Sequence, residues 1–470
     1  MFFTDQTYSH APVAISDDGV RISMGDIRTL SSRFAQVAAG RKKLAFCLCS
    51  NTHPSLAGYM SMLENGIVPV MLDAGKDVEL LQNLYVHYRP ELIWCPSQLV
   101  SLFGGAVNFF SFGTYSLLGC SHNAESRVLH PDLALLLTTS GSTGSPKLVR
   151  LSYENLRSNA ESIATYLQIT SEERPITSLP MYYSYGLSVI NSHLVRGATI
   201  LLTDKPVIQK GFWSFAKEQK ATSLAGVPYT YEMLRRLRVF RMDLPYLKTM
   251  TQAGGKLNAD LAKEYIEQAA VVGKRFIVMY GQTEATARMS YLPWEHAAEK
   301  YASIGIAIPG GSFMLTDTDG NVITCPDVDG ELVYKGPNVS MGYAECVEDL
   351  AKGDENQGIL HTGDIARRDA DGYYYITGRL KRFVKIWGNR CNLDATEQLV
   401  KSITPDCACA GVDDRITVFV TENGQESRIR AYLSEKTGLN VRAFAVKVID
   451  TIPKNPSGKV LYSELQKMLD

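Results

Sequence analysis

Short runs of apolar residues recur along most of the chain, and between them apolar positions return every three or four residues. The runs are typical of buried strands, and the three-to-four spacing predicts amphipathic helices. Strands are expected at residues 44–49, 67–72, 132–137, 148–151, 198–202, 223–227 and 276–279, and helices at 53–65 and after Ser152. This alternation of strands and helices predicts an α/β fold with largely parallel sheets.

The pattern changes near Ser303. From there the expected strands are short, and Asp-Gly pairs predict turns at positions 319–320, 329–330 and 371–372, which together indicate a smaller β-rich subdomain. A basic cluster from Arg379 to Arg382 precedes a final α/β segment. We therefore predict an N-terminal domain at 1–380 and a C-terminal domain at 381–470.

Composition and charge narrow the possible functions. The chain has 470 residues, of which 45% are hydrophobic and 21% charged, as in ordinary globular proteins. A net charge of −1 argues against a nucleic-acid-binding protein, which normally has a basic excess. No apolar run approaches the length of a membrane span, and the first residues lack the pattern of a secretion signal. The nine cysteines lack the spacing of a zinc site, so we expect reduced thiols and a cytoplasmic location.

One polar loop carries the strongest chemical signal. Residues 138–147 lie between two expected strands and combine several hydroxyls, two glycines and Lys147. Glycines let backbone N–H groups turn inward, and hydroxyls and a lysine add donors and charge, so the loop is predicted to bind phosphate. It is not a Walker A motif, because Pro146 precedes the lysine and Leu148 follows it. A polar hairpin turn with a surface lysine is the alternative interpretation.

Other polar motifs follow along the chain. Within the segment 280–284, Thr283 can donate to a phosphate and Glu284 can bind Mg²⁺. Asp364 follows a turn, and its carboxylate suits the paired hydroxyls of a ribose. Lys459 lies on a C-terminal loop. Each motif alone has a plainer explanation as a solvated acid, a turn-stabilising aspartate or a surface lysine, so their combination matters most.

Together and in this order, the motifs resemble those of the adenylate-forming, or AMP-binding, superfamily, and most of all a stand-alone acyl- or aryl-CoA ligase. The resemblance includes the segments 179–187, 252–257 and 330–336. It implies a large N-terminal domain of two α/β sheet subdomains and a β-rich subdomain, followed by a small mobile α+β C-terminal domain with a hinge near Lys381. It also implies two steps, in which a carboxylic acid and ATP form an acyl-adenylate and pyrophosphate, and the thiol of coenzyme A then displaces AMP.

The resemblance implies roles for individual residues. The loop up to Lys147 would hold the β- and γ-phosphates, Glu284 would bind Mg²⁺, and Lys459 would bridge the acid and the α-phosphate, with Thr283 also catalytic. The nucleotide-binding set comprises Thr139, Ser140, Gly141, Ser142, Thr143, Gly144, Gly254, Gly255, Tyr280, Gly281, Asp364 and Arg379. The acid pocket comprises Tyr183, Gly226, Val227, Met279 and Gln282. The hinge and thiol channel comprise Lys381, Lys385, Trp387 and Gly388.

Two departures from the family pattern bear on the substrate. Tyr183 stands where acyl-CoA synthetases often have histidine, and no acidic residue lies between Pro180 and His193 to pair with the ammonium of an amino acid. We therefore predict a hydrophobic or aromatic carboxylic acid as the substrate. Coenzyme A is the expected acceptor, and the phosphopantetheine thiol of a separate carrier protein is the alternative. A luciferase-like oxygenating enzyme and a nucleotide-binding protein without catalysis are further alternatives.

Overall fold

Two units make up the α/β fold of this chain. The computed structural model describes residues 11–75, 78–120, 128–138, 147–387, 389–454 and 460–469. The first unit consists of Met1–Ser312 and Lys335–Leu360, and the second of Phe313–Tyr334 and His361–Asp470. The first unit is therefore not one continuous stretch of chain, because a later segment returns to it.

A nine-stranded sheet of the first unit has the order β16-β15-β14-β13-β12-β10-β11-β1-β2. Neighbouring strands from β14 to β1 are parallel, and the strands at both edges are antiparallel. The strands are β1 (Ala14–Ser16), β2 (Arg21–Ile22), β10 (Pro175–Ile176), β11 (Ile200–Leu202), β12 (Ser223–Gly226), β13 (Thr249–Gln252), β14 (Arg275–Tyr280), β15 (Ser290–Tyr291) and β16 (Ile306–Ala307).

The other large sheet has eight strands in the order β20-β9-β8-β4-β3-β5-β7-β6, with a parallel centre from β8 to β5. Its strands are β3 (Lys43–Cys49), β4 (Ile67–Asp73), β5 (Leu92–Pro96), β6 (Val107–Phe112), β7 (Tyr115–Gly119), β8 (Leu133–Thr138), β9 (Leu148–Ser152) and β20 (Tyr343–Ala344). Strands β3 and β4 are buried almost throughout, which explains their unbroken apolar runs. The predicted parallel α/β sheets are confirmed.

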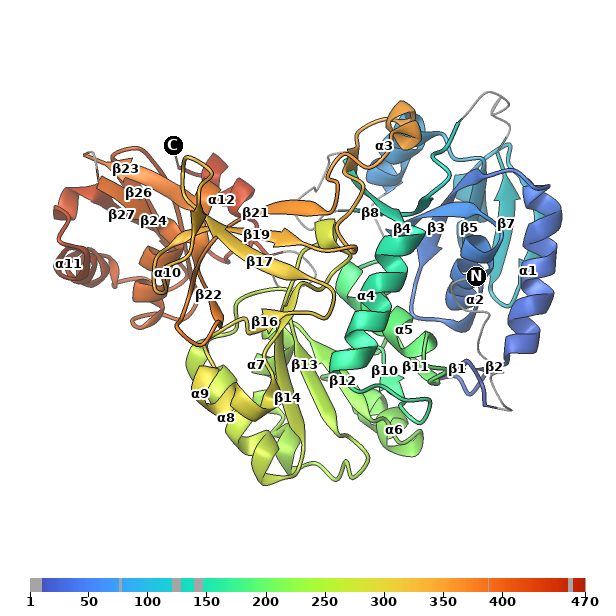
Figure 1. The fold of residues 1–470 in the computed structure, drawn as a ribbon, viewed down its shortest axis with the longest axis horizontal. Helices are drawn as coiled ribbons and strands as arrows, with labels where there is room; N and C mark the ends of the chain where they lie inside the picture. Colours follow the sequence, from blue (N-terminus) through green and yellow to red (C-terminus); the bar gives the residue numbers. More distant parts are fainter. Residues whose placement is uncertain are drawn as a thin grey trace. The chain divides into compact units, whose positions relative to one another are not determined.

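Helices surround and separate these sheets (Figure 1). Ser152 caps the N-terminus of α4 in a capping box with Asn155, whose backbone N–H donates to the Ser152 side chain. The buried core joins residues of both sheets with residues of α2, α4 and α5. The helices are α1 (Met24–Ala38), α2 (His53–Glu64), α3 (Val78–Tyr88), α4 (Tyr153–Tyr166), α5 (Ser184–Leu194), α6 (Lys210–Glu218), α7 (Pro228–Arg236), α8 (Ala259–Val271) and α9 (Ala297–Lys300). Within the described parts of the chain, no helix is long and apolar enough to cross a membrane.

A fully buried arginine holds the returning segment, Lys335–Leu360, against the rest of the first unit. Arg150 lies on β9, and its guanidinium donates to the backbone carbonyls of Met341, Tyr343 and Lys352. It also forms an ion pair with Glu355. Strand β20 pairs antiparallel with β9, so the same strand fixes the segment through its backbone and through this side chain.

The second unit contains a five-stranded sheet of order β18-β17-β19-β21-β22. Its strands are β17 (Ser312–Thr316), β18 (Val322–Ile323), β19 (Gly330–Lys335), β21 (Ile359–Arg368) and β22 (Tyr374–Arg379). The predicted turns at Gly320 and Gly372 are confirmed, with φ of +84° and +88°. The predicted turn at 329–330 is wrong, because Gly330 begins β19. A Cβ on Gly330 would lie 2.5 Å from Ile323 Cδ1, so this glycine serves close packing instead.

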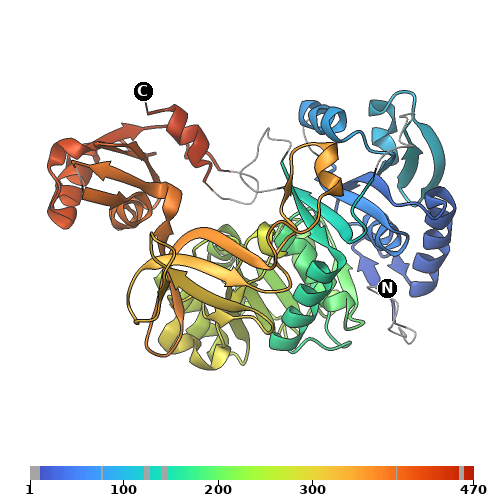
Figure 2. The same ribbon diagram turned by 45° about the horizontal axis from the view of Figure 1, so that its top comes forward.

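The remainder of the second unit is a small α+β region (Figure 2). It contains β23 (Phe383–Ile386), β24 (Asn389–Asn392), α10 (Leu393–Lys401), β25 (Cys407–Val412), β26 (Arg415–Val420), α11 (Glu426–Thr437), β27 (Phe444–Val448) and α12 (Tyr462–Lys467). Strands β25, β26 and β27 form a sheet that packs on α10 and α11 through an apolar core. The proposed hinge at Lys381 lies between β22 and β23, inside this unit, and the division at 380/381 stays a prediction.

Candidate functional site

Three neighbouring parallel strands bring predicted site residues to one edge of the nine-stranded sheet. Gly226, Gln252 and Val278 are aligned in register on β12, β13 and β14. The chain leaves these strands at their carboxyl ends, through 227, 253–255 and 281–284. Ligands of open α/β sheets bind at such carboxyl ends, so the predicted adenine and acid residues occupy a suitable edge.

Tyr183 packs directly against Gly254. Tyr183 precedes the first residue of α5, and Gly254 has a φ of +82°, a left-handed conformation that favours glycine. A Cβ added to Gly254 would lie 2.6 Å from Tyr183 Oη and 3.1 Å from Val227 Cγ1. Burial raises the pKa of Tyr183 to about 12, so its phenol is neutral and offers a hydrogen-bond donor. The absent side chain at Gly254 therefore makes room for this tyrosine in the predicted acid pocket.

The segment after β14 folds back tightly on itself. A Cβ on Gly281 would lie 1.7 Å from the carbonyl oxygen of Ala287, so only glycine fits there. Thr286 and Ala287 both have positive φ, of +56° and +98°, which is uncommon for residues other than glycine. Asn338 of the returning segment holds this turn, because its carbonyl accepts from the Thr286 hydroxyl at 2.7 Å. Such strained, well-anchored turns are typical of functional sites.

Thr283 and Glu284 lie at the start of this turn, and both are half-buried. The hydroxyls of Thr283 and Ser184 are 3.0 Å apart, which places two hydroxyls beside the beginning of α5. The backbone carbonyl of Glu284 accepts from the Ser340 N–H at 2.8 Å, and its side chain accepts from the Tyr343 hydroxyl, also at 2.8 Å. The carboxylate is thus held in place and still partly accessible.

Tyr343 connects Glu284 to Lys147. Its ring lies beneath the Lys147 ammonium, which is 3.7 Å from the ring centroid, while its hydroxyl donates to Glu284. Lys147 also lies 3.8 Å from the Glu345 carboxylate. Burial, followed by the charge of Glu284, raises the pKa of Tyr343, so its hydroxyl stays protonated. The pairing of β20 with β9 therefore brings the predicted phosphate-binding lysine and the predicted metal ligand to one place.

The residues around Glu284 fit a magnesium ion that is bound together with phosphates. Magnesium usually retains several waters and takes one or two protein carboxylates along with phosphate oxygens. Glu284 offers one partly accessible carboxylate whose orientation is fixed by Tyr343. A hard oxygen ligand of this kind beside a lysine suits a metal-bound polyphosphate.

Tyr280, Gln282 and Met279 flank the same turn. The Gln282 amide approaches the Tyr280 hydroxyl at 3.4 Å, and both side chains are half-buried. Met279 is 3% exposed and belongs to the apolar cluster that also contains Val227. These contacts group the predicted acid-pocket residues around the carboxyl ends of β12 and β14.

Arg288 contacts residues of the candidate site, and the sequence reasoning missed it. It follows the strained turn and is 1% exposed, with its guanidinium 4.1 Å from the centre of the Tyr185 ring. It also contacts Met279 Sδ. The available signal was a single charged residue within the otherwise uncharged segment 285–294. Tyr343 was missed too, because a pairing of β20 with a strand almost two hundred residues earlier cannot be read from local pattern.

In the second unit, Asp364 and Arg379 face each other on paired strands. They are register partners of β21 and β22, and Arg379 Nε lies 3.1 Å from Asp364 Oδ1. Asp364 is 3% exposed, whereas the Arg379 side chain is 46% exposed. The structure therefore brings together the two residues predicted for the ribose end of the nucleotide.

The predicted thiol-channel residues lie on and after β23. Lys385 and Trp387 are exposed, and Trp387 has a φ of +46°. Their backbone N–H groups donate to Asp413 and Asp414, at 2.8 Å and 2.7 Å. Lys381 lies in a short 3₁₀ turn, Leu380–Arg382. Outside the described residues lie Thr139, Ser140, Gly141, Ser142, Thr143, Gly144, Gly388 and Lys459.

Comparisons with known proteins agree with this arrangement. A family model described as "AMP-binding enzyme" matches residues 4–344. Feruloyl-CoA synthase from an Amycolatopsis species is 29% identical over 352 residues, covering 72% of this chain and 70% of that protein.

Two solved structures share the fold. The ATP-bound structure of MatB from Rhodopseudomonas palustris has a TM-score of 0.79 at 22% identity and covers 99% of this chain and 97% of its own. The o-succinylbenzoate CoA synthetase of Bacillus subtilis, in complex with its acyl-adenylate intermediate, has a TM-score of 0.78 at 21% identity, with 97% and 96% covered.

Proposed function

The chain belongs to the AMP-binding enzyme family, and from this premise we propose that it joins a carboxylic acid to coenzyme A in two ATP-dependent steps. In the first step the acid's carboxylate attacks the α-phosphorus of ATP, the bond to the β-phosphate oxygen breaks, and pyrophosphate leaves. In the second step the thiol of coenzyme A attacks the acyl carbon, and AMP leaves. The chain is thus an AMP-forming acid–thiol ligase, as its similarity to feruloyl-CoA synthase supports.

The observation that carries this proposal is the group formed by Lys147, Tyr343 and Glu284. Attack of a carboxylate on the triphosphate of ATP needs positive charges that are held in position where the pyrophosphate leaves. The Lys147 ammonium lies above the Tyr343 ring, and the Tyr343 hydroxyl fixes the Glu284 carboxylate. Lys147 would accompany the leaving pyrophosphate. Glu284 would hold Mg²⁺, which when bound neutralises phosphate charge.

Other residues would bind and orient the reactants. The hydroxyl of Thr283, paired with Ser184, would donate to the α-phosphate. Gly254, Gly255 and Tyr280 would flank the adenine. In the second unit, the Asp364 carboxylate, oriented by Arg379, would accept hydrogen bonds from the ribose hydroxyls.

The acid pocket supports a substrate with an apolar body. Tyr183, Val227 and Met279 are part of one apolar cluster, together with Tyr185 and Ala253. A relative named for a feruloyl product also favours an aromatic or similarly apolar acid. We therefore keep a hydrophobic or aromatic carboxylic acid as the proposed substrate class.

A carrier-protein thiol is the second candidate acceptor. Its phosphopantetheine arm presents the same reactive thiol as coenzyme A, so the chemistry at the acyl carbon would be identical. Lys385 and Trp387, both exposed on the second unit, would contact either form of the arm. We also propose a cytoplasmic location, which is supported by buried free thiols at Cys47, Cys49, Cys95, Cys407 and Cys409.

The first experiment is acid-dependent exchange of labelled pyrophosphate into ATP, over a panel of carboxylic acids. We expect exchange with at least one apolar acid, and thioester formation when coenzyme A is added. Exchange with no acid would contradict ligase activity. Thioester formation on a carrier protein but not on coenzyme A would replace the proposed acceptor.

A second experiment separates the two steps. Lys459→Ala should abolish pyrophosphate exchange but leave thioester formation from a supplied acyl-adenylate largely intact. Lys454→Ala is the matched control, because that nearby lysine is occupied by an ion pair with Asp406 at 3.0 Å. Equal loss of both steps in the Lys459 variant would contradict a role confined to adenylate formation.

A further inference from the structure

Arg288 is a buried cation surrounded by neutral groups. It is 1% exposed, and among the described residues no carboxylate lies within ion-pair distance of it. Its side-chain contacts are the face of the Tyr185 ring, the Tyr166 hydroxyl at 3.5 Å and the Met279 sulfur. Its Nε has no hydrogen-bond partner. A buried guanidinium normally has a carboxylate or several acceptors, since desolvation of an ion is unfavourable by several kcal/mol.

The tyrosines beside Arg288 do not supply the missing negative charge. Burial raises the pKa of Tyr166 to about 12 and also raises the pKa of Tyr185. Both phenols are therefore neutral at physiological pH. Tyr185 donates its hydroxyl proton to the Thr251 carbonyl at 2.8 Å, so it is already engaged elsewhere.

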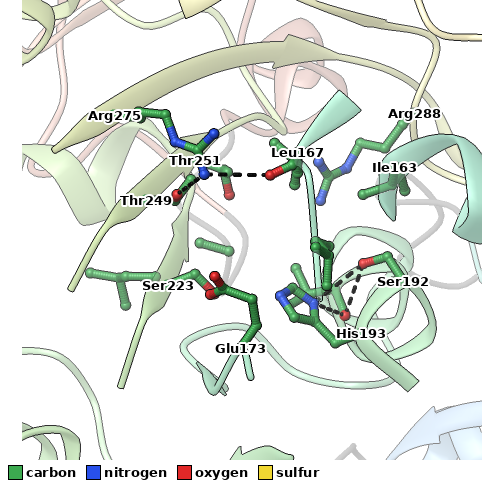
Figure 3. Close-up of a pocket in the computed structure, with 14 residues that line it drawn as sticks. Ile163, Leu167, Glu173, Ser192, His193, Ser223, Thr249, Thr251, Arg275 and Arg288 are labelled. Carbon is green, nitrogen blue, oxygen red and sulfur yellow. Dashed lines mark hydrogen bonds between the residues drawn. The ribbon is translucent and has the colours of Figure 1, made fainter. Parts of the chain in front are cut away.

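Arg288 also lines a small cavity between α4, α5 and strands β12 to β14. Arg288 and His193 lie on one side of it, and Arg275 and Ser223 lie on the other (Figure 3). The cavity measures about 20 Å³, enough for about one water molecule. The Ser223 hydroxyl, like Arg288 Nε, has no hydrogen-bond partner. Two unpartnered polar groups on one cavity indicate a place for a polar or anionic group.

The charges around the cavity favour an anion. His193 is neutral, because burial lowers its pKa to about 4. Glu173 contributes one carboxylate, which already accepts from the Thr222 hydroxyl and lies 3.9 Å from Lys248. Arg275 and Arg288 contribute two guanidinium groups, and Arg275 is engaged by the Leu167 and Thr249 oxygens. Arg288 is thus the cation left to receive an incoming anion.

Contacts connect this cation to the proposed acid pocket. Met279 and Tyr185, which touch Arg288, belong to the same cluster as Tyr183 and Val227. The Tyr183 and Tyr185 rings meet edge to face, with centroids 6.4 Å apart. Tyr183 lies at Gly254, just after the carboxyl end of β13, whereas Arg288 lies over the face of the Tyr185 ring. A substrate passing Tyr183 would therefore approach Arg288 with the end that is remote from its reacting carboxylate.

We propose that the acid substrate carries a second anionic group, most simply a second carboxylate, and that Arg288 pairs with it at the inner end of the acid pocket. This proposal rests on the proposed ligase function and specifies its substrate class. A guanidinium presents parallel N–H donors that match both oxygens of a carboxylate. A simple monocarboxylic acid would leave Arg288 unpaired, whereas an apolar acid with a remote carboxylate would satisfy it.

Matched acids provide the test. Pyrophosphate exchange and thioester formation are measured with a monocarboxylic acid, the dicarboxylic acid of the same chain length and the corresponding monoamide, in aliphatic and aromatic series. We expect the best dicarboxylic acid to exceed its monoacid and monoamide partners at least tenfold in kcat/KM. In thermal unfolding with ATP, the same diacid should raise the Tm more than its partners do.

Arg288→Met then separates substrate recognition from structure. The variant should lose at least tenfold in kcat/KM for the diacid and should have a higher kcat/KM for the monoacid than the unmodified enzyme. Its KM for ATP should be unchanged. Arg288→Lys should retain part of the diacid preference, because it keeps a point charge. Preference of the unmodified enzyme for monoacids over diacids would overturn the proposal, even if neither variant folds. Absence of exchange with every acid would instead contradict the ligase function itself.

Discussion

Substitution of Tyr343 by phenylalanine tests the connection between the lysine and the proposed magnesium ligand. The change removes one hydroxyl, which donates to Glu284 at 2.8 Å, and keeps the ring beneath Lys147. We expect Glu284 to lose its fixed orientation while Lys147 keeps its place. The apparent affinity for Mg²⁺ should therefore fall, while the fold is preserved.

The expected size of the effect follows from the exposure of the pair. A hydrogen bond to a charged group contributes about 1.5–3 kcal/mol when it is well buried. Tyr343 is 36% exposed and Glu284 is half-buried, so solvent screening reduces this to about 1 kcal/mol. That free energy corresponds to an increase of about fivefold in the Mg²⁺ concentration needed for half-maximal exchange.

Tyr343→Leu should have an additional effect, because it also removes the ring beneath Lys147. A cation–π contact at a partly exposed site contributes about 0.5–1 kcal/mol, which predicts a further two- to fivefold loss in the rate of pyrophosphate exchange. The matched control is Tyr246→Phe. That half-exposed tyrosine has Lys220 5.2 Å from its ring centroid and precedes β13, at the opposite end of the strand from the site.

The assay is acid-dependent pyrophosphate exchange with Mg²⁺ titrated at a fixed ATP concentration. Because the pKa of Tyr343 is raised, its hydroxyl stays protonated, and the ratio between the parent and the phenylalanine variant should be constant from about pH 6 to about pH 9. An unchanged Mg²⁺ requirement in Tyr343→Phe would refute the argument that this hydroxyl orients Glu284. An equal change in the Tyr246 control would show a nonspecific effect.

Three further predictions concern other parts of the site. Between pH 7 and pH 5 the protein should lose about 2 kcal/mol more stability in denaturant unfolding than His193→Asn. The reason is that the imidazole pKa is about 4 when folded and 6.5 when unfolded, so protonation favours the unfolded state; parallel pH profiles would contradict it. Gly254→Ala should raise the KM for the acid about tenfold, because its Cβ would lie 2.6 Å from Tyr183 Oη. Adding Tyr183→Phe should recover part of this loss, since the nearest remaining ring atom, Cζ, would lie 3.7 Å from that Cβ. No recovery in the double variant would argue against the contact. Asp364→Asn should raise the KM for ATP about tenfold, and Arg379→Met should raise it less, since the arginine is half exposed. An unchanged KM for ATP in both variants, measured by steady-state kinetics, would contradict a role of this pair in nucleotide binding.

The central elements of the fold were predictable because their signals are local. Strands β3 and β4 are apolar runs buried on both faces, and Ser152 caps α4 with the capping box that its residue type favours. The turns at Gly320 and Gly372 were predictable for the same reason, since a left-handed φ selects glycine. The turn predicted at 329–330 was wrong because close packing also selects glycine. A sequence cannot distinguish a glycine required by a turn from one required by close packing.

The site was predictable only in part, because its connections are between distant segments. The positions of Glu284 and Lys147 could be inferred from motifs, but their contact through Tyr343 depends on the pairing of β20 with β9. Arg288 illustrates a second limit. A lone arginine in a sequence is normally taken as a surface charge, whereas this one follows the strained turn at Thr286 and Ala287 and is buried.

The anchoring of the returning segment by Arg150 has a practical consequence for producing fragments of this protein. The family match ends at residue 344, yet the groups that satisfy the buried guanidinium include Lys352 and Glu355, farther along the chain. A fragment truncated at 344 would keep Tyr343 but leave Arg150 with part of its partners removed. Expression of the first unit therefore requires Lys335–Leu360 to be joined to Ser312 by a designed linker, and a chimera that exchanges this segment should exchange β9 with it.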